Sequence, residues 1–175
     1  VPGPAPAMPD AELADVGRQR LRGDRAGACR ALAGVEKGGV ARAFQCADDS
    51  ELARVGADAA FEIGSVSKTM TAALLADLLL QGKGSLDDTL ASWLPEGTKV
   101  PDYQGRPILL RHVVTHTSGL PSLPSRLGAT SMDDPYANLD EAALLASLGE
   151  ATLTVAPGTR FEYSNFASML LSYAV

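Results

Sequence analysis

The stretch FEIGSVSKTMTAALLADLLLQG, residues 61–82, contains the strongest helix signal in the chain. Its apolar residues recur at helical spacing and Gly82 follows as a helix-ending glycine, so the pattern predicts a helix over residues 66–81. Ser65 and Lys68 stand at the start of this helix and lie on one face, because they are one turn apart. The positive end of the helix dipole stabilises negative charge on a serine at this position, and a neighbouring ammonium favours ionisation of its hydroxyl. The pair is a candidate nucleophile with its activating group.

The same two residues also have a purely structural interpretation. Ser65 would then cap the helix, and Lys68 would be a solvated charge. The spacing alone is not specific, so support for catalysis must come from other segments of the chain.

A tyrosine motif at residues 163–165, Tyr-Ser-Asn, supplies such support. The Tyr163 phenol becomes a usable base if an ammonium such as Lys68 lowers its pKa from near 10. The amide of Asn165 is suited to orienting a bound carbonyl compound. Tyr136 and Asn138 have the same spacing, but they lie in a proline-containing loop where turn and capping roles are common. We favour Tyr163 because it stands at a junction between a turn and a helix.

Capping residues, turns and apolar spacing predict the other elements of the chain. They are a helix over 10–22 capped by Asp10, a hairpin of strands 29–36 and 40–46, a short helix from Ser85 to Pro95, a helix over 110–116, a helix over 141–148 capped by Asp140 and stopped by Gly149, and an amphipathic helix from Phe166 onward. The last pattern has no stop signal before Val175, and one hairpin is too little sheet for a stable core. We therefore expect the chain to be the N-terminal part of a larger protein.

The two cysteines flank the predicted hairpin. If residues 37–38 form a two-residue turn, Glu36 pairs with Gly39 and Cys29 lies opposite Cys46. A disulfide there would add about 3 kcal/mol in an oxidising compartment. A change of one residue in the turn would separate the pair and leave two small apolar side chains, so both interpretations stay open.

The composition of the 175 residues limits the partners of this protein. An apolar fraction of 46% predicts a folded chain, and a net charge of −6 argues against nucleic acid as a partner. No apolar run approaches the length of a membrane span, so we expect none. The start, VPGPAPA, is typical of an extended tether in a protein whose leader peptide has been removed.

Other chemistry has weaker support in the sequence. His112 and His116 lie four residues apart, but the zinc-peptidase pattern needs a glutamate where Val113 stands, so we predict polar packing and no metal. Ser118 has no Gly-x-Ser-x-Gly around it. The acidic pairs are typical of solvated loops and helix starts, which gives a glycosidase interpretation little support.

Three segments together resemble the serine β-lactamase and penicillin-binding-protein superfamily. They are residues 61–72, the stretch LRHVVTHTSGLP at 110–121, and PGTRFEYSN at 157–165. The second and third are similar to the class C β-lactamase branch, whereas the class A pattern has Ser-Asp-Asn in the role of the tyrosine motif. Three segments in the same order are far more specific than any one of them.

This resemblance implies an α+β fold of the β-lactamase/transpeptidase type. It also implies that Ser65 is the acylated nucleophile, that Lys68 and Tyr163 share proton transfer, and that Asn165 holds the substrate amide. The backbone N–H of Ser65 would be one oxyanion donor. Residues 116–119 would be structural and shape the helical lobe.

The chain also departs from the family pattern. Leu109 stands where relatives often have a threonine that caps the next helix, a local loss of about 1 kcal/mol. The Lys/His-Thr/Ser-Gly strand motif is absent, and family members are about twice as long, as a two-lobed molecule requires. The expected division is a tether at 1–9, the N-terminal helix and hairpin of the α/β lobe at 10–60, and the nucleophile helix with a truncated helical lobe at 61–175.

The leading hypothesis is therefore a periplasmic or secreted, class C β-lactamase-like serine hydrolase without a cofactor. It would act through an acyl-enzyme on a β-lactam, a D-amino-acid peptide or a small ester. The alternative is a non-catalytic fragment or interaction module that needs a complementary C-terminal half. Its unpaired edges would then favour strand exchange with another copy, giving a homo-oligomer.

Overall fold

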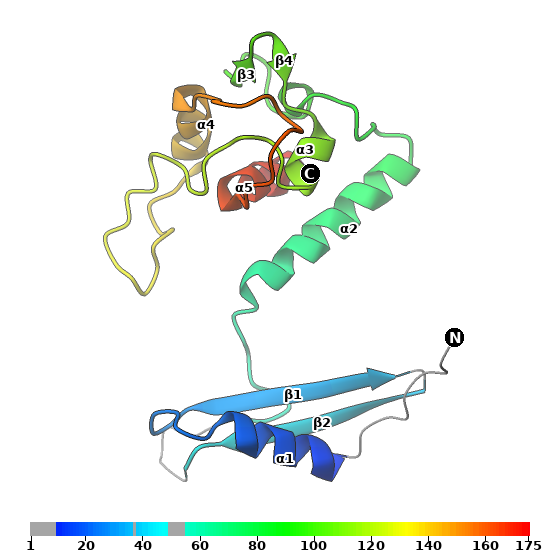
Figure 1. Cartoon of the computed structure of the whole chain (residues 1–175), viewed down its shortest axis with the longest axis vertical. Coiled ribbons are helices and arrows are strands. Elements are labelled where there is room, and N and C mark those ends of the chain that lie inside the picture. Colours follow the sequence, from blue (N-terminus) through cyan, green and yellow to red (C-terminus); the bar gives the residue numbers. More distant parts are fainter. Residues whose placement is uncertain (1–9, 37, 49–54) are drawn as a thin grey trace. The chain divides into compact units, whose positions relative to one another are not determined.

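The computed structural model describes residues 10–36, 38–48 and 55–175. The chain divides into two compact units, Val1–Glu62 and Ile63–Val175, which are described separately (Figure 1). The predicted tether at 1–9 and the turn residue Lys37 lie outside the described residues.

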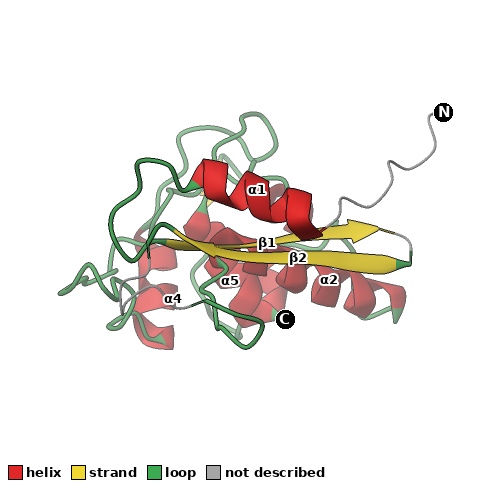
Figure 2. Ribbon diagram, turned by 90° about the horizontal axis from the view of Figure 1, so that it is seen from below, coloured by secondary structure: helices red, strands yellow, loops and turns green. Residues whose placement is uncertain are grey.

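The described residues of the first unit contain one helix and one hairpin. Helix α1 (Asp10–Arg20) lies along the antiparallel strands β1 (Cys29–Glu36) and β2 (Gly39–Cys46), as Figure 2 shows. The predicted register is confirmed, because Glu36 pairs with Gly39 and Cys29 pairs with Cys46. The two cysteines form a disulfide, which decides between the two interpretations of the pair.

Helix α1 approaches the hairpin closely at a glycine. Leu13 is buried together with Ala41 and Ala43 of β2. A Cβ atom on Gly17 would lie 2.9 Å from a methyl carbon of Leu32, closer than Cβ atoms are found. Glycine is unfavourable inside a helix, and here the packing of helix on sheet compensates for that cost. Asp10, the predicted cap, is instead the first residue of α1, and the helix ends at Arg20 rather than at residue 22. The Asp10 carboxylate accepts the Arg42 backbone N–H at 3.0 Å, so it ties the helix to β2.

We expect loss of the disulfide to destabilise this hairpin. Replacing both Cys29 and Cys46 by serine should lower the free energy of opening β1 and β2 by about 3 kcal/mol, because the unfolded chain regains the freedom of the closed loop. Hydrogen exchange of the strand amides in the whole protein measures this. The wild type with a reductant is the matched control and should show the same loss. Equal protection of oxidised and reduced protein would contradict the prediction.

The second unit begins with the predicted nucleophile helix. A 3-10 turn, η1 (Gly64–Val66), leads into helix α2 (Ser67–Leu80). Gly82 has φ +73°, and the Lys83 N–H donates to the Leu78 carbonyl at 3.0 Å, which ends the helix in the left-handed manner that glycine favours. The predicted helix is confirmed, with Ser65 placed in the 3-10 turn before it.

Shorter elements complete this unit. They are a second 3-10 turn η2 (Leu90–Trp93), the two-residue strands β3 (Asp102–Tyr103) and β4 (Arg106–Pro107), and the helices α3 (Leu110–Val114), α4 (Glu141–Glu150) and α5 (Asn165–Ala174). The pair β3–β4 was not predicted. Helix α3 ends two residues earlier than the pattern indicated.

Two more helix boundaries in this unit differ from the prediction. The short helix does not start at Ser85, because Thr89 caps η2 by accepting the Ser92 N–H, while Ser85 belongs to a preceding turn. Helix α4 starts as predicted, with the Asp140 carboxylate accepting the Ala143 N–H at 2.8 Å. It continues through Gly149, which keeps helical geometry and packs against the side chain of Lys99.

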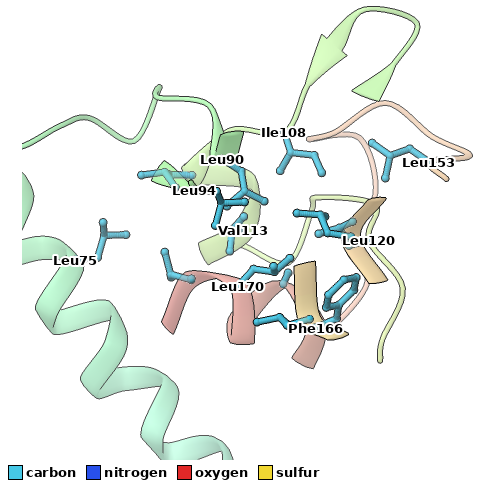
Figure 3. Packing of buried hydrophobic residues seen from close by; sticks show 14 residues of the cluster. Leu75, Leu90, Leu94, Ile108, Val113, Leu120, Leu153, Phe166 and Leu170 are labelled. Atoms are coloured by element: carbon cyan, nitrogen blue, oxygen red, sulfur yellow. The ribbon is translucent and has the colours of Figure 1, made fainter. Parts of the chain in front are cut away.

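One apolar core joins the helices of the second unit (Figure 3). Leu75 is the buried residue of α2, and it belongs to the same cluster as Val113 of α3 and Phe166 and Leu170 of α5. The remaining members are Leu90, Leu94, Ile108, Leu110, Leu120, Leu144, Leu148, Leu153, Ala167 and Leu171. The amphipathic pattern predicted from Phe166 onward is confirmed, and its burial holds the N-terminus of α5 close to α2. Within the described ranges, no helix combines the length and the apolar character needed to cross a membrane.

Candidate active site

Ser65 and Lys68 meet at the entrance to α2. Gly64 has φ +53°, a conformation that glycine adopts easily, and it turns the chain into the helix. The Ser67 hydroxyl donates to the Gly64 carbonyl at 2.7 Å and holds this turn. One helical turn then brings Lys68 Nζ to 2.9 Å from Ser65 Oγ. The Lys68 ammonium donates this hydrogen bond to the hydroxyl oxygen.

Tyr163 reaches the same hydroxyl from a segment 98 residues further along the chain. Its phenol lies 2.8 Å from Ser65 Oγ, and Lys68 Nζ lies 5.0 Å from the centre of its ring. The tyrosine is 40% exposed, so the site is open to a ligand. The structure therefore brings Ser65, Lys68 and Tyr163 together.

Asn165 completes the cluster as the first residue of α5. Its Oδ1 accepts a hydrogen bond from Lys68 Nζ at 2.8 Å. Ser164 caps this helix by accepting the Ala167 N–H at 3.0 Å, and its hydroxyl donates to the Pro121 carbonyl at 2.6 Å. Ser164 is fully buried, so these bonds fix the backbone on which Asn165 stands.

The electrostatics of the cluster favour the phenolate form of Tyr163. The pKa of Tyr163 is lowered, first by hydrogen bonding with Lys68, then by the hydrogen bond with Ser65 and by the charge of Lys68, against an opposing effect of desolvation. A lower pKa gives more phenolate at a given pH. Lys68 thus both donates to the Ser65 hydroxyl and lowers the pKa of the phenol that lies against it.

The competing tyrosine motif has a different environment. Asn138 donates from Nδ2 to the Gly128 carbonyl at 2.9 Å, so it stabilises the loop, as its turn context indicated. Tyr136 lies on the wall of a pocket of about 650 Å³ that Ser65 and Asn165 also line. Among the described residues, the hydrogen bond from a tyrosine to Ser65 comes from Tyr163.

The two histidines each accept a backbone hydrogen bond. His112 Nδ1 accepts the Leu109 N–H at 3.0 Å, and His116 Nδ1 accepts the Ser164 N–H at 3.1 Å. Burial, and then the charge of Arg111, lowers the pKa of His112, which keeps it neutral and able to accept. His112 thus caps α3 where Leu109 has no side-chain acceptor. The described residues contain no group of three side chains suited to a metal ion.

A contact of His116 was not foreseen from the sequence. Its ring stacks on the Tyr163 ring, with centres 4.3 Å apart and planes 27° apart. The only sequence signal was the position of His116 within the motif at 110–121, where it was assigned to shaping the helical lobe.

Comparison with known proteins identifies the family. A family model described as Beta-lactamase matches residues 6–175, so the chain belongs to the β-lactamase family. It is 36% identical over 118 residues to the D-alanyl-D-alanine-carboxypeptidase/endopeptidase AmpH of Escherichia coli K12, covering 67% of this chain and 30% of AmpH. It is 33% identical over 117 residues to the esterase EstB of Burkholderia gladioli, covering 61% of this chain and 29% of EstB.

The fold agrees with this family. The crystal structure of a β-lactamase/D-alanine carboxypeptidase from Yersinia pestis, complexed with citrate, matches with a TM-score of 0.74 and 25% identity, over 94% of this chain and 47% of that one. The predicted α+β fold of β-lactamase/transpeptidase type and the resemblance to the superfamily are confirmed. The chain belongs to a family of serine hydrolases and spans about 30% of the length of the curated relatives named here.

Proposed function

We propose that this chain carries the nucleophile and the base of a serine hydrolase that acts through a covalent acyl-enzyme. The observation that supports this most directly is the position of Ser65 Oγ, which is hydrogen-bonded to Lys68 Nζ at 2.9 Å and to the Tyr163 phenol at 2.8 Å. A nucleophile in contact with both a cation and a base is the arrangement that covalent catalysis needs.

The reaction would proceed in two steps. The Ser65 O–H gives its proton to the Tyr163 phenolate while Oγ forms a bond to the carbonyl carbon of the substrate. The bond from this carbon to the leaving nitrogen or oxygen breaks, and the leaving group takes the proton from Tyr163. Water then attacks the ester on Ser65, gives a proton to Tyr163, and releases the acid and the free serine, whose oxygen regains the proton.

Two further groups support this chemistry. Ser65 lies in the first turn of η1, where a backbone N–H has no acceptor within the helix, so this N–H is available to the developing oxyanion. The Oδ1 of Asn165 is held by Lys68, which leaves its Nδ2 to donate to a substrate amide. Lys68 thereby orients the amide of Asn165 as well as the hydroxyl.

The preferred substrate class is a peptide that ends in a D-amino acid. The relationship to AmpH, which is named as a D-alanyl-D-alanine carboxypeptidase/endopeptidase, supports this choice. A small ester is the second candidate because EstB is named as an esterase. A β-lactam presents a similar carbonyl and is the third.

We also propose that the protein works in the periplasm or outside the cell. The disulfide between Cys29 and Cys46 supports this, because such bonds persist in oxidising compartments. In this proposal residues 61–175 carry the catalytic groups, and residues 10–60 contribute the N-terminal helix and hairpin of the α/β lobe.

Covalent labelling tests the proposal. The gene product that carries this chain is incubated with a fluorophosphonate and, separately, with a β-lactam, and the adduct is located by intact mass and peptide mapping. We expect one adduct on Ser65 and none in the Ser65→Ala variant. Ser92, a serine of the other 3-10 turn whose hydroxyl donates to the Thr89 carbonyl, gives the matched control Ser92→Ala, which should label like the wild type. Absence of an adduct on Ser65 in folded protein would favour the non-catalytic module.

A further inference from the structure

His116 has an unusual backbone conformation next to the candidate catalytic cluster. It follows α3 and has φ +55°, in the left-handed region that non-glycine residues seldom adopt. Such conformations persist where the surrounding structure holds them and are frequent at functional sites. The imidazole of His116 is half-buried.

The contacts of His116 surround Tyr163. The imidazole stacks on the phenol ring with centres 4.3 Å apart. On one side of Tyr163, the Glu162 N–H donates to the His116 carbonyl at 2.8 Å, and on the other side the Ser164 N–H donates to His116 Nδ1 at 3.1 Å. One residue thus fixes the backbone before and after Tyr163 and covers one face of its ring.

The charge state of His116 agrees with this arrangement. Burial, and then the positive charge of Lys68, lowers the pKa of His116, so the ring is neutral at pH 7. A neutral imidazole with its proton on Nε2 leaves Nδ1 free to accept from Ser164, whereas an imidazolium would not accept. Lys68 faces the phenol from α2, Ser65 faces it from η1, and the imidazole of His116 stacks on its ring.

A turn-forming role alone would not require an imidazole. Asparagine also tolerates the left-handed conformation and offers an acceptor oxygen, but it has no ring to place against the phenol. The stacked geometry is the feature that distinguishes the two roles.

We propose that His116 is a positioning residue for Tyr163, holding the phenol against Ser65 and Lys68 through the ring stack and the Ser164 hydrogen bond. This inference rests on the proposed function, because it assigns Tyr163 as the base. It goes beyond a structural role for residues 116–119, since it predicts an effect on the titration of one particular side chain.

The acylation rate as a function of pH tests the inference. The rate of Ser65 labelling should rise with pH as Tyr163 becomes phenolate. We expect His116→Asn to lower this rate about 10- to 100-fold at pH 7 and to move the rise by about one unit toward higher pH, since a loosened phenol loses part of the effect of Lys68. His112→Asn is the matched control, because His112 also accepts a backbone N–H but caps α3. It should leave the position of the rise unchanged.

The inference is overturned if His116→Asn lowers the labelling rate without moving the pH at which the rate rises. It is also overturned if His112→Asn moves that pH by the same amount, or if His116→Asn has the rate and pH profile of the wild type. If His116→Asn does not fold, His116→Phe takes its place, because it keeps a ring but cannot accept from Ser164 N–H. When Tyr163 is already phenylalanine, adding His116→Asn should lower the labelling rate by less than about threefold, because the phenol that His116 positions is gone. A further tenfold loss there would also overturn the inference.

A measurement without turnover separates this inference from the proposed function. The pKa of Tyr163 can be measured by NMR from the pH dependence of the 13C chemical shift of tyrosine Cζ. The signal of Tyr163 is assigned by its loss in Tyr163→Phe. We expect a higher pKa of Tyr163 in His116→Asn than in the wild type and no change in His112→Asn. If the wild type does not label at Ser65 but this pKa moves, the proposed function fails and the positioning role stands. An unmoved pKa rejects the positioning role whatever the labelling result.

Discussion

Replacing Lys68 by methionine is expected to lower the rate of Ser65 acylation by about 10³-fold. The ammonium donates to Ser65 Oγ at 2.9 Å and to Asn165 Oδ1 at 2.8 Å, and it is the largest cause of the lowered pKa of Tyr163. Methionine has a similar length and an apolar character but neither charge nor donor. The variant therefore loses activation of the nucleophile, orientation of the amide and part of the phenolate population of Tyr163 in one step.

The same variant should also change the pH dependence of the labelling rate, in a direction set by the pKa of Tyr163. Without the ammonium the pKa of Tyr163 rises toward its ordinary value, so less phenolate is present at neutral pH. The rise of labelling rate with pH should move to higher pH in Lys68→Met. Intact-mass kinetics with a fluorophosphonate at several pH values measures both effects. Lys83, which follows the other end of α2, supplies the control Lys83→Met, whose rate and profile should match the wild type. Wild-type behaviour of Lys68→Met would reject the assigned role.

Replacing Tyr163 by phenylalanine is expected to lower the acylation rate by about 10²- to 10⁴-fold, the usual contribution of a general base. Phenylalanine keeps the ring that stacks on His116 and removes only the hydroxyl at 2.8 Å from Ser65 Oγ. The change therefore tests proton transfer with little disturbance of packing. The rise of rate with pH that reports Tyr163 should disappear from the profile.

Tyr136→Phe is the natural comparison for this variant. Tyr136 has the same spacing to an asparagine and lines the pocket that Ser65 and Asn165 also line, but Asn138 is hydrogen-bonded to the loop at Gly128. We expect Tyr136→Phe to lose less than about tenfold in rate and to keep the rise with pH. A larger loss in Tyr136→Phe than in Tyr163→Phe would mean that the base has been assigned to the wrong tyrosine.

Local patterns predicted those features that depend on neighbours in the chain. Ser65 and Lys68 share a face because a helix turn spans that spacing, and the two-residue turn set the register that placed Cys29 opposite Cys46. Asp140 capped α4 as predicted, for the same reason of short range. Short-range patterns also gave a wrong cap, because two hydroxyl residues lie close together and Thr89 rather than Ser85 caps the turn that contains Trp93.

Tertiary packing determined features that the spacing of residues in the sequence could not predict. Gly17 argues against a helix by propensity, yet it lies inside α1, where a Cβ atom would come within 2.9 Å of a Leu32 methyl carbon of the hairpin. The two tyrosine motifs are indistinguishable by spacing, and burial of α5 in the core selected Tyr163 as the partner of Ser65. The contact of His116 with Tyr163 depends on the same packing.

Local residue patterns were enough to predict the helix entered through Ser65 and Lys68 and the hairpin with its cysteine pair, because both depend on hydrogen bonds and side-chain spacing within a few residues. Three motifs in order were enough to predict the family. The three-dimensional packing was needed to show which tyrosine reaches the serine and which histidine stacks on that tyrosine. Both depend on apolar residues of α2, α3 and α5 meeting in one core, and contacts between segments so far apart in the chain arise from collective packing rather than from local pattern.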